Sequence, residues 1–115
     1  MNIVTLGIAS RDQVSERFKA AMAGKSQGSF ISFESFETLL KVLTIKRWQI
    51  IDALTGIEPV SIREAARLVN RDVKAVHGDI QALLSTGILR KENSKISFPF
   101  DRLHVDFELP RIAAG

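Results

Sequence analysis

Residues 61–91 read SIREAARLVNRDVKAVHGDIQALLSTGILRK, and this stretch decides the predicted fold. Ser61 is followed three positions later by Glu64, which is the spacing of a capping box that opens a helix. The helical pattern breaks near Asn70, resumes in a longer helix and ends at Gly87, because glycine readily adopts the left-handed conformation that closes helices. A short helix, a sharp turn and a longer helix are typical of a helix-turn-helix.

The longer helix has two contrasting faces when its residues are placed at steps of about 100°. Its inward face is apolar and comprises Val73, Val76, Ile80, Leu83 and Leu84. In a helix-turn-helix the second helix lies in the major groove of DNA, so the outward face is the predicted reading surface. That face is basic at its start and small further along, and it comprises Arg71, Lys74, Ala75, Gly78 and Ala82.

The residues of this reading surface have different predicted roles. Arg71 can form a bidentate pair with guanine or clamp a phosphate, and Lys74 can reach either. Asn70 caps the longer helix or reads adenine, and His77 at the flank contacts a phosphate or is an ordinary surface side chain. Gly78 costs an exposed helix roughly 1 kcal/mol relative to alanine. Either close approach of DNA or tight packing on a neighbouring helix would account for it.

A β-hairpin is expected after the longer helix. Ile88 and Leu89 begin a strand, residues 92–95 (ENSK) form the turn, and residues 96–100 return with a bend or a free edge at Pro99. The hairpin takes the place of a wing, whose tip can reach phosphates. Acidic residues interrupt the basic ones here, which favours a specific DNA binder over a charge-driven coating protein. The residues predicted to contact DNA are Ser61, Arg63, Arg67, Asn70, Arg71, Lys74, Ala75, His77, Gly78, Lys91 and Lys95.

Two further helices are expected before residue 61. Thr44 caps the second of them, and Gly56 and Pro59 prevent its continuation. Trp48 is predicted to lie in the core. The apolar face of the first helix comprises Phe36, Leu39, Leu40 and Leu43, and that of the second comprises Ile45, Trp48, Ile51 and Leu54, with Ile50 alongside.

The two ends of the chain add strands that a minimal winged helix does not require. Residues 3–8 and 103–109 alternate as strands, and residues 30–33 form a short strand or an extended lead-in. Ser10 is predicted to cap a helix with an apolar stripe of Val14, Phe18 and Met22. Because their apolar faces need cover, the first and last strands are predicted to contribute to a shared sheet or to a dimer contact.

Composition bounds the class of protein. The 115 residues carry a formal net charge of +3 and no cysteine, which allows one compact domain and excludes disulfides and thiol catalysis. No run approaches the roughly 18 apolar residues of a membrane span and no secretory signal is recognisable, so a cytoplasmic protein without membrane partners is expected. No catalytic triad, phosphate-binding glycine loop or metal-ligand set is evident. Neither an enzyme nor a cofactor is therefore predicted.

Residues 61–91 resemble the helix-turn-helix and wing of MarR-like and ArsR-like transcriptional regulators. The longer stretch from FESFETLLKVLTIKRWQIIDALTG (33–56) through FPFDRLHVDFEL (98–109) resembles more closely a group of short winged-helix regulators that are often the antitoxins of toxin–antitoxin pairs. The resemblance covers about the last two-thirds of the chain. The chain departs from MarR proteins in its ends. MarR proteins usually dimerise through long terminal helices, whereas this chain is predicted to have a strand and a helix at its start and a strand at its end. The resemblance implies recognition-helix positions for Asn70, Arg71, Lys74 and Ala75, and wing positions for Lys91 and Lys95.

The sequence therefore predicts a mainly helical α+β protein with a single domain. Residues 34–100 form the winged helix-turn-helix, residues 1–33 a strand-helix appendage, and residues 101–115 a strand and tail. The predicted function is that of a homodimeric, sequence-specific regulator of double-stranded DNA, a repressor that can also regulate its own toxin–antitoxin operon. The alternative is a protein-interaction module that neutralises a partner toxin, with DNA binding secondary or absent. RNA binding is less favoured, because no aromatic-rich stacking surface is evident.

Overall fold

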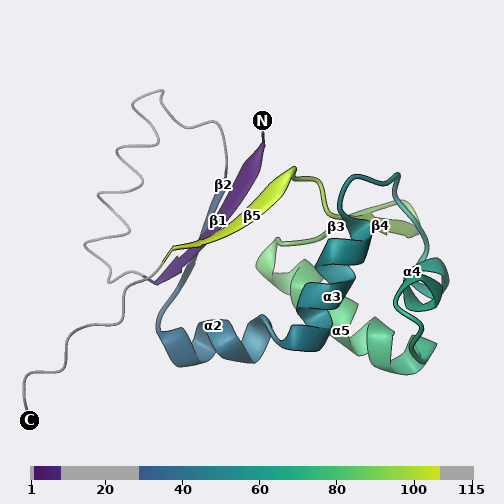
Figure 1. The fold of residues 1–115 in the computed structure, drawn as a ribbon, viewed down its shortest axis with the longest axis horizontal. Helices are drawn as coiled ribbons and strands as arrows, with labels where there is room; N and C mark the ends of the chain where they lie inside the picture. Colours follow the sequence, from purple (N-terminus) through teal and green to yellow (C-terminus); the bar gives the residue numbers. More distant parts are fainter. Residues whose placement is uncertain (1, 9–28, 107–115) are drawn as a thin grey trace, which may run out of the picture.

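The computed structural model describes residues 2–8 and 29–106 of the chain. Figure 1 shows strands β1, β2 and β5 on one side of the molecule and helices α3, α4 and α5 on the other. This combination of helices with small sheets confirms the predicted α+β class. The helix predicted after Ser10 and the strand residues predicted beyond 106 lie outside the described residues. The described elements are β1 (Ile3–Ile8), β2 (Ser29–Phe33), α2 (Phe36–Val42), α3 (Ile45–Leu54), α4 (Ile62–Leu68), α5 (Val73–Thr86), β3 (Arg90–Glu92), β4 (Lys95–Ser97) and β5 (Arg102–Asp106).

Strand β1 is the centre of a sheet with the order β2-β1-β5, and both neighbours pair with it in parallel. Val4 and Leu6 on β1 are fully buried, and the register places them beside Leu103 and Val105 of β5. These apolar side chains share the face of the sheet that packs on the core. The prediction that the first and last strands share a sheet is confirmed.

Helices α3 and α4 begin, and α5 ends, at the capping residues that the sequence indicates. The hydroxyl of Thr44 accepts a hydrogen bond of 3.2 Å from the backbone N–H of Arg47, and that of Ser61 accepts one of 3.1 Å from Glu64. The reciprocal half of the predicted capping box is replaced, because the carboxylate of Glu64 instead pairs with Arg67 at 2.9 Å. Gly87 ends α5 with a φ of 89°.

The hairpin β3–β4 is joined to the start of α4 by backbone pairing. Val60 and Ile96 exchange two hydrogen bonds of 3.0 and 2.7 Å, as an isolated antiparallel bridge. The hairpin is shorter than predicted, since its first strand begins at Arg90 and its return strand ends at Ser97. Pro99 lacks the N–H that a longer ladder would need, so residues 98–100 leave the sheet as irregular chain, in which Phe98 and Phe100 are buried.

One core runs through both halves of the molecule, but several residues predicted to lie in it are exposed. Ile50, Ile51 and Leu54 bury one side of α3, and Trp48 and Ile45 point away from that side, with 46% and 78% of their surfaces exposed. The prediction of a core Trp48 is therefore wrong. Its i,i+3 spacing to Ile51 was misleading because Ile50 and Leu54 set the centre of the buried face.

Two further residues that were predicted to lie on an inward face are exposed. Val73 is 42% exposed because it starts α5, and side chains in a first turn point back beyond the packed part of a helix. Leu40 is 50% exposed on α2, where Leu39 is the buried residue. Among the described residues, no helix combines the length and the apolar character needed to cross a lipid bilayer.

Candidate nucleic-acid interface

Asn70 closes the turn between α4 and α5 but does not cap α5. Asn70 adopts a left-handed φ of 54°, its N–H bonds to the carbonyl of Arg67 at 3.1 Å, and the N–H of Arg71 bonds to that of Ala66 at 3.0 Å. These two bonds form a Schellman motif, in which asparagine tolerates the left-handed position. Asp72 caps α5 by accepting from the N–H of Lys74 at 3.1 Å. The first of the two roles predicted for Asn70, capping the longer helix, is therefore wrong.

Helices α4 and α5 pack closely because the inward side of α4 is small. Ala65 and Ala66 are each 1% exposed and lie in the same core cluster as Val76, Ile80 and Leu83 of α5. Larger side chains on α4 would push the helices apart. This contact and the Schellman turn fix the orientation of α5 against α4, so the opposite side of α5 faces outward.

The outward side of α5 carries most of the residues predicted for it. Lys74, Ala75, His77 and Gly78 are all exposed, whereas Ala82 is half-buried. A Cβ added at Gly78 would have no heavy atom within 4 Å, apart from the backbone of its own helix. Tight packing of Gly78 on a neighbouring helix is therefore excluded within the described residues.

Sequence reasoning missed two exposed residues of this side. Gln81 follows Gly78 by three positions and Ser85 follows Gln81 by four, so both extend the line of exposed residues that starts at Lys74. The hydroxyl of Ser85 donates a hydrogen bond of 2.8 Å to the carbonyl of Ala82. Residues 74, 78 and 81 are spaced i, i+4, i+7, and this spacing is the signal in the sequence that places Gln81 on the same face as Lys74.

Arg71 does not lie on the exposed face where the sequence places it. Its Nη1 is 2.9 Å from Oδ2 of Asp79, and Nε of Arg47 donates to Oδ1 of the same carboxylate at 3.0 Å. The side chains of all three residues are only 18–21% exposed. Nη1 of Arg71 is buried, and its contact is an ion pair rather than a well-aligned hydrogen bond. Asp79 thus pairs with the positive charge of Arg71, which the sequence predicted to contact DNA.

The cluster of Arg47, Asp79 and Arg71 joins three elements. Arg47 on α3 also donates at 3.1 Å to the carbonyls of Lys41 and Val42 in α2. Burial raises the pKa of Asp79, but the hydrogen bond from Arg47 and the positive charges of Arg71 and Arg47 outweigh it and hold that pKa below its ordinary value. The carboxylate is therefore ionised at neutral pH and fixes the start of α5.

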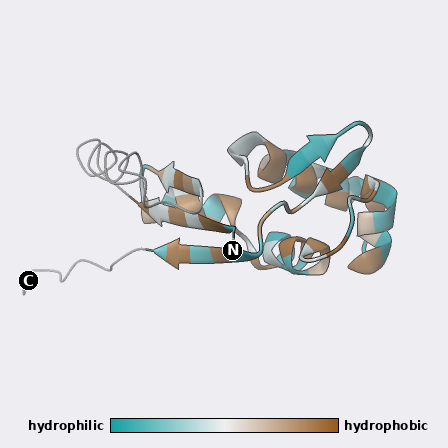
Figure 2. Cartoon of the chain, turned by 90° about the horizontal axis from the view of Figure 1, so that it is seen from above, coloured by the Kyte–Doolittle hydropathy of each residue, from teal (hydrophilic) through white to brown (hydrophobic). Residues whose placement is uncertain are grey.

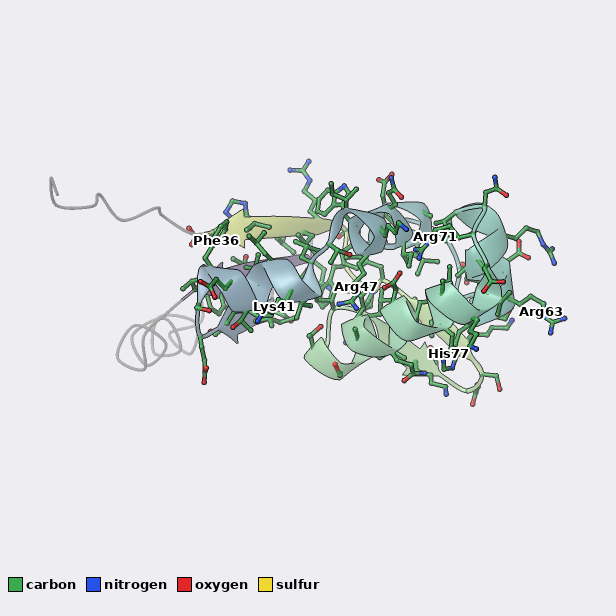
Figure 3. The ribbon with its side chains drawn as sticks, turned by 90° about the horizontal axis from the view of Figure 1, so that it is seen from below. Phe36, Lys41, Arg47, Arg63, Arg71 and His77 are labelled. Atoms are coloured by element: carbon green, nitrogen blue, oxygen red, sulfur yellow. The ribbon has the colours of Figure 1, made fainter. Side chains whose placement is uncertain are left out.

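Further basic residues lie on α4 and on the hairpin. Figure 3 shows Arg63 extending from the outer end of the helical half, while Arg47 and Arg71 lie between the helices. Arg63 and Arg67 of α4 are exposed, and Arg67 is paired with Glu64 at 2.9 Å. On the hairpin, Arg90, Lys91 and Lys95 are exposed as well. Ser61 is exposed, and its hydroxyl is engaged in capping α4.

No metal centre competes with this interpretation in the described part of the chain, where no three His, Cys, Asp or Glu side chains are grouped to hold an ion. The comparisons give one match. The family model HVO_A0114 matches residues 42–105, which is more than half of the 115 residues. The matched range contains α3, α4, α5 and the β3–β4 hairpin, and it ends within β5. No curated protein and no solved structure matches the chain.

Proposed function

The chain belongs to the HVO_A0114 family, and we propose that it is a winged helix-turn-helix regulator that binds double-stranded DNA sequence-specifically. The order α3, α4, α5 and hairpin supports this, and so does the pairing of Val60 with Ile96, which adds a third short segment to the hairpin. In this arrangement α5 is the recognition helix and the β3–β4 hairpin is the wing.

Gly78 is the observation that carries the proposal. It lies in the interior of α5 with open space around it, so it lowers helix stability by roughly 1 kcal/mol without serving the packing of the described residues. Close approach of a partner surface along α5 would account for this glycine, because a side chain at position 78 would hold that surface away. A DNA groove is the partner that suits a glycine flanked by Lys74 and Gln81.

The mechanism divides between positioning and reading. Arg63, Lys91 and Lys95 contact phosphates and set the orientation of the protein on the duplex, which contributes affinity without sequence choice. Lys74 and Gln81 on α5 then reach base edges in the major groove, where glutamine pairs well with adenine. Bound at its operator, the protein represses transcription by occupying the site.

Selection from a pool of random DNA duplexes tests the function directly. The wild-type protein is expected to enrich a defined motif, and its association constant for that motif is expected to fall steeply with salt concentration, because phosphate contacts release counterions. Lys74→Glu, which reverses one exposed charge of α5, is the matched negative variant. If both proteins enrich the same sequences equally, α5 does not read DNA.

A second candidate function is a protein-interaction module that neutralises a partner toxin. The sheet β2-β1-β5 favours it, because this sheet stands apart from the α4–α5 surface and a minimal winged helix does not need it. Both roles can coexist in an antitoxin that represses its own operon. Co-expression with the product of the adjacent gene distinguishes them: a stable complex that survives Lys74→Glu supports the interaction role.

A further inference from the structure

Strand β5 ends the sheet with one edge unpaired in the described part of the chain. It pairs with β1 on one side only, and Figure 2 shows no described helix or strand beyond its other side. An open edge presents a row of backbone N–H and C=O groups that another strand can extend. Neither lysine nor proline, the residues that commonly block such edges, occurs in Arg102–Asp106.

The sequence of β5 is complementary to itself when two copies run antiparallel. A two-fold axis at His104 places Arg102 opposite Asp106 of the second copy and Leu103 opposite Val105 of the second copy. Opposite charges therefore meet on one face of the sheet and apolar side chains on the other. A carboxylate accepts several hydrogen bonds, so this pairing leaves room for other contacts of Asp106.

The faces of the sheet restrict the register. Leu103 and Val105 lie on the same face as the buried Val4 and Leu6, and each remains half-buried. A slip of one residue would put Arg102 opposite an apolar residue and reverse the faces. The axis at His104 keeps the faces and pairs all five residues of the strand.

We propose that two copies of this chain associate through antiparallel pairing of β5 with β5, which joins their sheets into one continuous sheet. The dimer itself is independent of DNA. Its consequence for DNA rests on the proposed function, since the two-fold axis would give the regulator two copies of α5 and match it to palindromic operators.

Cysteine crosslinking tests the register, because the natural chain contains no cysteine. In His104→Cys the two introduced residues face each other at a Cα separation of about 4.5–5.5 Å, which suits a disulfide. Arg102→Cys is the matched control on the same strand and face, and its two copies are separated by about 13 Å along the strands. Oxidised His104→Cys is expected to form a covalent dimer, and oxidised Arg102→Cys is expected to form none. Equal crosslinking of the two, or none with His104→Cys, would overturn the proposal.

Charge reversal measured by analytical ultracentrifugation gives an independent test. Arg102→Asp and Asp106→Arg are each expected to weaken dimerisation about tenfold or more, because each creates two like-charge pairs across the axis. The double variant restores both pairs and is expected to return within about threefold of wild type. Circular dichroism of each variant checks that the fold is retained. A monomeric wild type, or a double variant weaker than both single ones, contradicts the proposal.

These tests use no DNA, so the two proposals can fail separately. Crosslinking through position 104 without duplex selection would leave the dimer standing and reject the regulator. Duplex selection by a protein that does not crosslink at position 104 would leave the regulator standing and reject this interface.

Discussion

Asp79 holds Arg71 through a contact of 2.9 Å between Oδ2 and Nη1, so a side chain that the sequence places on the exposed face is only 18% exposed. Arg71 lies two residues before α5, next to its N-cap Asp72, and Arg47 on α3 occupies the other oxygen of the same carboxylate. The start of α5 is thereby tied to α3. In the proposed function, Lys74 and Gln81 further along α5 would therefore read the sequence in place of Arg71.

Removal of the shared carboxylate should destabilise the protein. Asp79→Ala leaves Arg47 and Arg71 close together without their anion, and we expect a loss of about 1–3 kcal/mol in the free energy of unfolding. Glu64→Ala is the control, because it removes an exposed partner of Arg67 and should cost less than about 0.5 kcal/mol. Urea denaturation followed by circular dichroism measures both. Equal losses would show that the Asp79 cluster has no special role.

The lowered pKa of Asp79 predicts acid sensitivity. A carboxyl group whose pKa is lower in the folded than in the unfolded state stabilises the fold above its unfolded value of about 3.9, and this stabilisation is lost as the pH falls through the folded value. The difference in unfolding free energy between wild type and Asp79→Asn should therefore be largest near neutral pH and shrink below pH about 4. A difference that stays constant from pH 7 to pH 3 would contradict the assignment.

Substitution by alanine should change the free energy of unfolding in opposite directions at two glycines, one inside α5 and one at its C-terminal end. Gly78→Ala is expected to raise the free energy of unfolding by up to about 1 kcal/mol and to weaken DNA binding, because position 78 is open in the free protein. Gly87→Ala should instead lower stability by about 1 kcal/mol, since φ is +89° at that position. Thermal denaturation and duplex titration measure the two effects. A Gly78→Ala protein with unchanged affinity would remove the main support for a DNA groove at α5.

The hairpin should contribute affinity without sequence choice. Lys91→Ala is expected to weaken binding to selected and scrambled duplexes by the same factor and to reduce the salt dependence by about one counterion. Fluorescence anisotropy over a series of salt concentrations measures both quantities. A loss confined to the selected duplex would indicate that Lys91 contacts a base.

The local elements of the fold were predictable because their signals are local. Thr44, Ser61 and Gly87 each mark a helix end through their own side chain or backbone preference, and the structure confirms all three. The alternation of residues 3–8 and 103–109 likewise predicted two strands, and the structure pairs residues 3–8 with residues 102–106 in one sheet. The hairpin length was less predictable, because pairing ended at Ser97, before Pro99, instead of at the last apolar residue.

The errors arose where distant parts of the chain decide the outcome. Arg71 and Asp79 are eight positions apart, beyond the i,i+4 spacing that signals a helical ion pair, and Arg47 reaches Asp79 across 32 positions. Trp48 has a helical spacing compatible with a core, and only the position of the buried face of α3 places it outside. Gly78 carried two explanations in the sequence, and the open space around it removes one of them.

The most direct measurement is the affinity of two charge-reversed variants for the duplex that the wild-type protein selects. Lys74→Glu changes an exposed residue on the outward side of α5, and Lys46→Glu makes the same change on an exposed residue of α3. The proposed interface predicts that Lys74→Glu loses at least about tenfold in affinity, while Lys46→Glu remains within about threefold of wild type. Equal affinities for the two variants would contradict the claim that α5 is the surface that meets DNA.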